Sequence, residues 1–133
     1  MIGVDNNVLL RLFVDDDPTQ ARAARDLVAE APTGGIFVTQ LAIVETLWLL
    51  RRSFGWKRDE QVRFLTTLLD SPVFKLENRF DFEKAADRFL FGKGEFPDCL
   101  IEVATERAGV DTIYTFDGKA ADRRLFTRLH SKG

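Results

Sequence analysis

Short apolar runs alternate with longer amphipathic segments along this chain. The runs predict strands at residues 2–4, 36–38, 73–76, 112–116 and 125–129. The segments, whose apolar residues recur every three or four positions, predict helices at 7–14, 19–31, 39–54, 57–70, 82–91 and 97–108, and a short one near 119–123. Strands that alternate with helices predict an α/β fold in which helices cover both faces of a parallel sheet.

Size and composition predict one globular domain over residues 1–133. The chain is 45% hydrophobic with twelve Phe and two Trp, which is enough apolar material for a packed core. The formal net charge of −2 provides no general attraction to nucleic acid or to an anionic membrane. Binding of RNA or DNA would therefore need local basic patches or metal ions.

The sequence also predicts a soluble protein of a reducing compartment, the cytoplasm. Its single cysteine, Cys99, excludes a disulfide within the chain. The first residues lack the basic and then apolar pattern of a signal peptide. The longest apolar-rich stretch, residues 41–50, is too short to span a bilayer and contains Glu45, so we expect no membrane partner.

Acidic residues stand at three element ends where a site would form. Asp5 ends the first expected strand and Asp117 the fourth, so both should lie at the carboxyl edge of the sheet. Ordinary alternatives are a helix cap for Asp5 and an Asp-Gly turn for Asp117. Asp98 begins a helix, where a carboxylate interacts well with the helix dipole. Glu102 follows one turn later on the same face; it could assist the site, although we rather expect an exposed pair with Arg107 or a solvated position.

A fourth acid, Glu45, lies within an apolar helix. Leu41, Trp48 and Leu49 lie three or four positions from it and Val44 directly precedes it, which predicts a carboxylate on an apolar face. A buried carboxylate needs an arginine, a hydrogen-bond network or a metal ion. A structural ion pair is the alternative to a metal site at this position.

Several carboxylates in one place repel one another unless a cation offsets their charge. Mg²⁺ prefers oxygen ligands and phosphate substrates, and a cluster of acids without histidine or cysteine suits Mg²⁺ or Mn²⁺ better than zinc. The single histidine, His130, stands near a polar chain end, where we expect it to be solvated.

Four short stretches give the chain a resemblance to a known family. They are GVDNNVL at 3–9, VE at 44–45, PDCLI at 97–101 and TFD at 115–117. In their order and separation they resemble PIN-domain ribonucleases, and within that family the VapC-like toxins of type II toxin–antitoxin systems, over essentially the whole chain. The resemblance implies a three-layer α/β/α sandwich around a parallel sheet of about five strands.

The resemblance also implies a site and partners. The implied site is Mg²⁺-dependent, with Mn²⁺ a possible substitute, and hydrolyses RNA phosphodiester bonds with Asp5, Glu45, Asp98 and Asp117. It places Asn7 and Thr115 where they orient the carboxylates. Asn6 stands where the family usually has Thr, so the rate or the metal preference could differ. A homodimer and an antitoxin segment that blocks the site are implied as well.

Basic and aromatic side chains give less specific indications. As a group, Arg11, Arg51, Arg52, Lys119 and Arg123 are candidates for a salt-sensitive track along the RNA phosphates, although each alone is ordinary surface charge. The aromatic residues Trp48, Phe54, Trp56 and Phe64 could line a groove for a partner helix or simply pack in the core.

Two alternatives remain to the nuclease interpretation. A phosphatase of the haloacid-dehalogenase type would use Asp5 as nucleophile and needs an acid two residues later, where this chain has Asn7. A catalytically silent PIN-like scaffold would bind RNA or a protein without cleavage. Four mutually repelling acids argue against such a scaffold, whereas Asn6 favours it.

Overall fold

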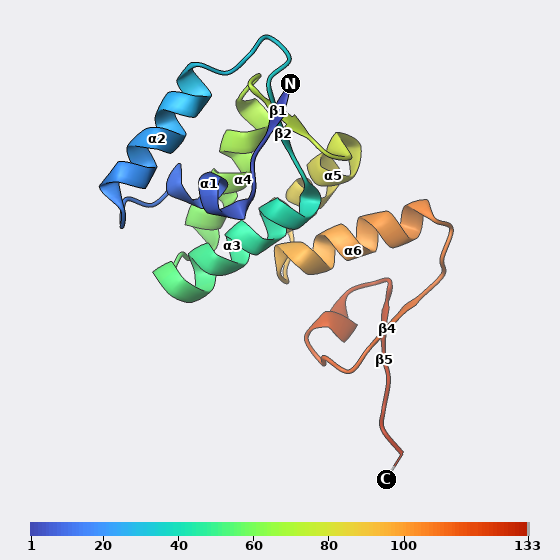
Figure 1. Ribbon diagram of the computed structural model, residues 1–133. Coiled ribbons are helices and arrows are strands. Elements are labelled where there is room, and N and C mark those ends of the chain that lie inside the picture. The colour runs from blue at the N-terminus through green and yellow to red at the C-terminus, as the bar shows by residue number, and fades with distance from the viewer. Residues whose placement is uncertain (133) are drawn as a thin grey trace. The chain divides into compact units, whose positions relative to one another are not determined.

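Two small parallel sheets, each with its own helices, make up the structure (Figure 1). The computed structural model describes residues 1–132. These divide into a first unit, residues 1–82, and a second unit, which begins at residue 83. Each unit is described by itself below.

The sheet of the first unit has β2 (Ile36–Val38) between β1 (Ile2–Gly3) and β3 (Phe74–Leu76). Ile36 lies opposite Ile2 on one side and Phe74 on the other, and both pairings are parallel. A glycine precedes the central strand, where Gly35 has φ +82°. A Cβ atom there would lie 2.6 Å from the carbonyl oxygen of Val73, so only glycine permits this close approach of the two backbone segments.

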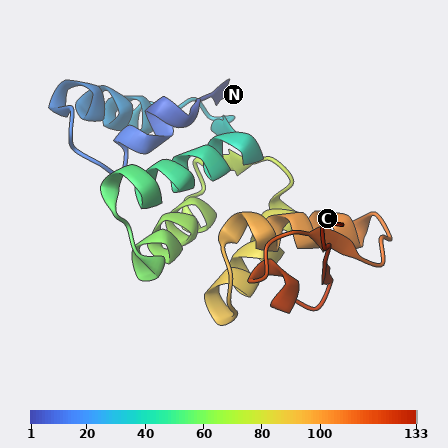
Figure 2. The same ribbon diagram turned by 90° about the horizontal axis from the view of Figure 1, so that it is seen from below.

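The helices of the first unit are α1 (Asn6–Arg11), α2 (Pro18–Ala29), α3 (Gln40–Phe54) and α4 (Arg58–Asp70). Side chains cap three of them: Asp5 accepts from the Val8 amide, Asp17 from the Gln20 amide and Thr39 from the Ala42 amide. Helix α1 packs on α2 and α3, and α3 lies beside α4 (Figure 2).

The first turn of α3 has a second, distant acceptor. The backbone amide of Gln40 donates to the Glu77 carboxylate at 2.9 Å. Glu77 directly follows β3, and its own amide donates to the Val38 carbonyl at 2.9 Å. Two hydrogen bonds therefore join the end of β3 to the end of β2 and the beginning of α3.

Aromatic side chains of the first unit separate into core and surface. Phe64 is fully buried, and its ring meets the Phe13 ring edge to face, with 4.7 Å between centroids. Trp56 is half-buried and packs on the same Phe13 ring. Trp48 is 51% exposed and Phe54 is exposed as well. Core packing thus explains Phe64 and Trp56, whereas Trp48 and Phe54 lie on the surface.

The second unit contains most of α5 (Arg79–Phe91), then α6 (Phe96–Arg107), β4 (Ile113–Thr115), the 3₁₀ helix η1 (Ala120–Asp122) and β5 (Phe126–Arg128). Strands β4 and β5 pair in parallel, with Ile113 opposite Phe126. In the core of this unit the Phe89 and Phe96 rings meet edge to face, with 6.1 Å between centroids, and Cys99 is fully buried.

The expected helices and strands are confirmed to within a few residues, as are the α/β class and the parallel pairing. The strands form one sheet of three and another of two in residues 1–132, where the sequence predicted a single sheet. Apolar runs of two or three residues indicate a strand but carry no information about its neighbours. One domain over residues 1–133 stays a prediction. No helix within residues 1–132 is long and apolar enough to cross a membrane.

Candidate active site

Asp5 lies where the first strand ends and the first helix begins. Its Oδ1 atom accepts a hydrogen bond from the Val8 amide at 3.1 Å, and its backbone is extended, as an N-cap requires. The side chain is exposed. The cap that the sequence offered as an alternative is therefore present. A carboxylate has acceptor sites beyond this one bond, so capping leaves room for another partner.

Asp5 borders a pocket of about 430 Å³ between α1 and α2. Its polar lining comes from Asp5, Asn7, Arg11 and Gln20, and its apolar lining from Val8, Ala23, Ala24 and Leu27. Arg11 is held inside this group, because it donates to the Asp16 carboxylate and, at 2.9 Å, to the Gln20 side chain. Asn7 thus lies beside Asp5 at one pocket, as expected, and Arg11 has internal partners rather than a free guanidinium.

Glu45 is exposed, so the prediction of a buried carboxylate on α3 was wrong. Its apolar neighbours Leu41 and Trp48 are 66% and 51% exposed. The buried side chains of α3 are instead Ala42, Ile43, Thr46, Leu47 and Leu50. This helix has two apolar stripes, and the spacing of residues does not tell which stripe packs. Glu45 consequently needs no internal ion pair.

Asp98 occupies the first turn of α6 and is half-buried. Burial raises the pKa of its carboxyl above the usual range, because the charged form loses solvent. Arg123 opposes this shift, whereas the negative charges of Asp117, Glu95 and Glu102 add to it. Asp98 and Asp117 therefore belong to one negatively charged region of the second unit.

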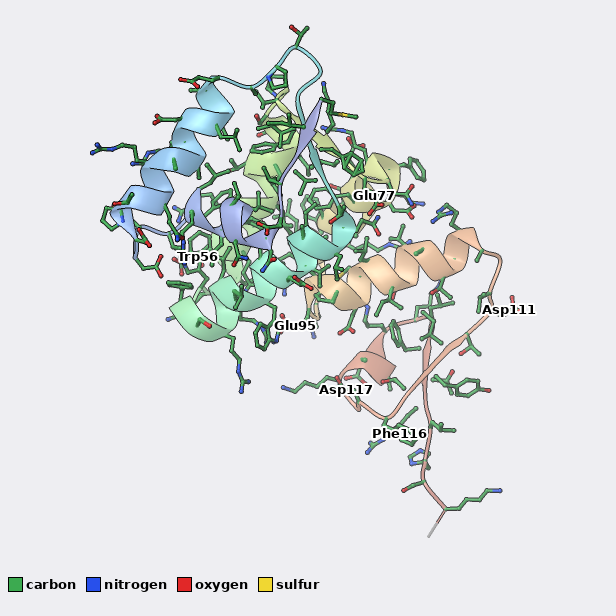
Figure 3. All side chains as sticks on the ribbon, viewed as in Figure 1. Trp56, Glu77, Glu95, Asp111, Phe116 and Asp117 are labelled. Carbon is green, nitrogen blue, oxygen red and sulfur yellow. The ribbon has the colours of Figure 1, made fainter. Side chains whose placement is uncertain are left out.

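Asp117 follows β4 and is exposed beside η1, where Figure 3 labels it. Its Oδ1 accepts from the Lys119 amide at 2.9 Å, and its own amide donates to the Thr115 hydroxyl at 3.0 Å. The turn predicted for Asp117 is thus present. Thr115 orients the main chain at Asp117, while the sequence suggested that it orients a carboxylate.

Glu102 is more buried than the sequence predicted. It is 8% exposed, and its carboxylate binds Arg88 at 2.6 Å and Arg123 at 3.0 Å. The expectation of a solvated or exposed position was therefore wrong. The sequence signal for its burial is its position between Cys99 and Val103, two apolar residues of α6 that are both buried.

The same pair involves Arg123, whose role as an RNA contact stays a prediction. Its side chain is 13% exposed, and its guanidinium is used by Glu102. Among the other basic candidates, Arg51, Arg52 and Lys119 are exposed. The Arg52 guanidinium lies 6.0 Å from the centre of the Trp48 ring. These three remain the accessible candidates for phosphate contacts.

The four acids are divided between the units. Asp5 and Glu45 lie in the first unit, and Asp98 and Asp117 lie in the second. Within either unit, the described residues include no group of three histidine, cysteine or acidic side chains that would hold a metal ion. A cluster of all four acids stays a prediction. Its chemistry fits a hard cation, because the donors are carboxylate oxygens and Asp98 lies among negative charges.

Comparison with known proteins places this site in context. The PIN domain family profile matches residues 2–124. A VapC ribonuclease of Aquifex aeolicus is 24% identical over 115 residues, which are 85% of this chain and 84% of that protein. The crystal structure of VapC20 of Mycobacterium tuberculosis, a sarcin–ricin loop cleaving toxin, aligns with a TM-score of 0.47 and 22% identity over 94% of this chain and 96% of that one.

Proposed function

Because this chain belongs to the PIN domain family, we propose that it is a Mg²⁺-dependent endoribonuclease and the toxin of a toxin–antitoxin pair, acting in the cytoplasm. The likeness to the VapC ribonuclease of Aquifex aeolicus supports this proposal. The observation that carries it is the shared negative region of Asp98 and Asp117. A half-buried carboxyl such as Asp98, with a raised pKa and a second acid nearby, is expected where a cation binds.

In this proposal Asp5, Glu45 and Asp98 hold one or two Mg²⁺ ions, and Asp117 completes the site. A bound Mg²⁺ supplies positive charge that activates water and stabilises the phosphoryl oxygens. Mn²⁺ has similar ligand preferences and is the expected substitute.

The remaining site residues orient these acids. Thr115 fixes the main chain at Asp117, and Asn7 lies beside Asp5 at the α1–α2 pocket. Asn6 follows Asp5 as the first residue of α1. An amide there can hydrogen-bond, but it does not reproduce the hydroxyl that the family usually has at this position.

RNA phosphates reach the acids along the exposed basic side chains Arg51, Arg52 and Lys119. Basic side chains that contact phosphates release the counterions bound to the RNA, so RNA binding weakens as the salt concentration rises. The cleavage rate at low RNA concentration should therefore fall with added salt. A rate that is insensitive to salt would argue against this track.

A cognate antitoxin of the VapB kind and a second copy of the chain are the proposed protein partners. The exposed apolar side chains Leu41 and Trp48, seven residues apart on one face of α3, suit an amphipathic helix laid along this helix. Such a helix would pass directly over Glu45, which shares the face of Leu41 and Trp48. Binding there would also block the site.

The test of the nuclease uses Asp5→Asn and Asp98→Asn. Both changes keep the shape of the side chain, and Asn is itself a good N-cap in place of Asp5, so both variants should fold. Cleavage of a labelled RNA with Mg²⁺ should fall at least about 100-fold in each, the range seen when charge stabilisation in a site is lost. Asp26→Asn, on the exposed side of α2, is the matched control and should remain active. Full activity of both site variants would refute the proposal.

The catalytically silent scaffold is the second candidate, and Asn6 is the observation that favours it. Calorimetric titration with Mn²⁺ separates the two functions. A nuclease should take up the ion in a manner that Asp98→Asn weakens, whereas a scaffold should show no uptake that depends on these carboxylates.

A further inference from the structure

Arg123 is fastened to α6 by two parallel hydrogen bonds. Its Nε donates to Glu102 Oε2 at 3.0 Å, and its Nη2 donates to Glu102 Oε1 at 3.2 Å. The side chains are 13% and 10% exposed, so water competes little for these bonds. A bidentate arginine–carboxylate pair fixes direction as well as distance. Arg123 is therefore a rigid attachment point between the end of η1 and α6.

A second arginine completes the surroundings of Glu102. Arg88 of α5 donates to Glu102 Oε1 at 2.6 Å and to Glu106 Oε2 at 2.6 Å. Glu102 thus binds two cations from two other elements, which offsets the cost of removing its charge from water. Loss of Arg123 alone would leave Glu102 paired with Arg88.

Consecutive hydrogen bonds connect Arg123 to the turn that carries Asp117. The Asp117 carbonyl accepts from the Ala121 amide at 3.1 Å, and the Ala120 carbonyl accepts from the Arg123 amide at 3.0 Å. With the Thr115 bond at the other end, these contacts leave the turn few alternative conformations. A displacement of Arg123 would be transmitted to Asp117.

The loop before α6 is also shaped around Arg123. The guanidinium donates through Nη1 to the Lys93 carbonyl. The next residue, Gly94, has φ +94°, and a Cβ atom there would lie 2.9 Å from the same Nη1. The positive φ favours glycine at this position, and the absence of a side chain leaves the space beside the Arg123 guanidinium open.

We propose that Glu102 and Arg123 are positioning residues for RNA cleavage, whose ion pair sets the separation of the Asp98 and Asp117 carboxylates. Glu102 lies one turn after Asp98 on α6, and Arg123 ends the turn that begins at Asp117. The pair thus holds Asp98 and Asp117 at a fixed separation without itself contacting RNA. This inference rests on the proposed nuclease function and adds two residues to it.

The experiment compares Arg123→Gln, Arg123→Lys and Glu102→Gln with wild type. Single-stranded RNA labelled with fluorescein is the substrate, with Mg²⁺ or Mn²⁺ added, and kcat and KM are measured separately. Hydrogen exchange of the backbone amides is measured on the metal-free proteins. Glu106→Gln is the matched control, because it removes one bond of Arg88 and leaves the bonds of Arg123 intact.

We expect kcat to fall about 10- to 100-fold in Arg123→Gln and Glu102→Gln, with KM within about twofold of wild type, as for other residues that orient metal ligands. Arg123→Lys keeps the charge but loses the paired bonds, so its kcat should be intermediate. Amides of residues 117–121 should exchange faster in all three variants, while those of α6 stay protected. Glu106→Gln should match wild type in kcat and in exchange at 117–121.

Two results would overturn the inference. Unchanged exchange at 117–121 in Arg123→Gln would show that the pair does not hold the turn. A higher KM with unchanged kcat would make Arg123 an RNA contact instead. If wild type cleaves no RNA with either metal, the proposed function fails, and the exchange data alone then decide whether the pair positions Asp117.

Discussion

The hydroxyl of Thr115 accepts a hydrogen bond from the backbone amide of Asp117 at 3.0 Å. Thr115→Val keeps the shape of the side chain and removes this acceptor. We expect a loss of about 1 kcal/mol in the free energy of unfolding, the usual contribution of such a bond. Cleavage should fall severalfold as the turn loosens. Urea unfolding measures the stability, and initial rates measure the cleavage. Thr115→Ser retains the hydroxyl and should have wild-type values of both. A Ser variant as impaired as the Val variant would contradict this role of the hydroxyl.

Asp5 has two separable roles, the cap of α1 and the proposed metal ligand. Serine is also a good N-cap, so Asp5→Ser should change the free energy of unfolding by only a few tenths of a kcal/mol, whereas Asp5→Ala should lose about 1 kcal/mol. Both should lose RNA cleavage, since neither has a carboxylate. Chemical denaturation and cleavage assays on the two proteins test this separation. Equal destabilisation by Ser and Ala would mean that the cap contributes little.

The two aromatic residues Phe64 and Trp48 should differ sharply in their contribution to stability. Phe64 is fully buried against Phe13, so Phe64→Ala leaves a cavity and should reduce the free energy of unfolding by about 3–5 kcal/mol. Trp48 is 51% exposed, and Trp48→Ala should cost less than about 1 kcal/mol. Thermal unfolding followed by circular dichroism provides the comparison. A loss at Trp48 equal to that at Phe64 would show that Trp48 is buried in solution.

The Arg88–Glu106 pair should give a small pH dependence of stability. Arg88 hydrogen-bonds Glu106 and holds the pKa of that carboxyl below its ordinary value, despite partial burial that acts the other way. A lowered pKa means that the unfolded chain binds the proton more tightly. The contribution of the pair is therefore complete above about pH 4.3, the ordinary pKa of Glu, and is lost as pH falls through the lower folded value.

A double-mutant cycle with Arg88→Met and Glu106→Gln isolates this term. Both side chains are nearly one-third exposed, so the coupling at pH 7 should be at most about 1 kcal/mol. The coupling energy should shrink towards zero as the pH is lowered and Glu106 becomes protonated. A coupling energy that increased at lower pH would contradict the claim that the pair stabilises the fold through ionised Glu106.

Local features of this fold were readable from the sequence because they depend on neighbouring residues. Thr39 and Asp5 cap their helices as expected, and the apolar runs around Ile36 and Phe74 form strands. The family resemblance carried by four short stretches is confirmed by the profile match over residues 2–124. Backbone preferences and short motifs act over a few residues, so the local order of the sequence was sufficient for these conclusions.

The errors concern contacts between distant segments. The spacing around Glu45 identified its neighbours correctly, but the side of α3 that packs depends on α1 and α4, which the spacing does not contain. Glu102 looked like a surface acid because Arg88 and Arg123, 14 and 21 positions away, are what make its burial tolerable. The burial of Arg123 was not foreseen for the same reason, because its partner Glu102 is 21 positions away.

The acceptor that Glu77 provides for the Gln40 amide has a consequence for synthesis of the chain. The two residues are 37 positions apart, so the bond forms only after a long loop has closed and β3 has joined β2. Until then the start of α3 lacks one of its two side-chain acceptors, and early turns of a helix fray when their amides are unsatisfied. A ribosome-bound chain shorter than 77 residues would thus present Glu45 on an incompletely anchored helix, because the acceptor for the Gln40 amide is still missing.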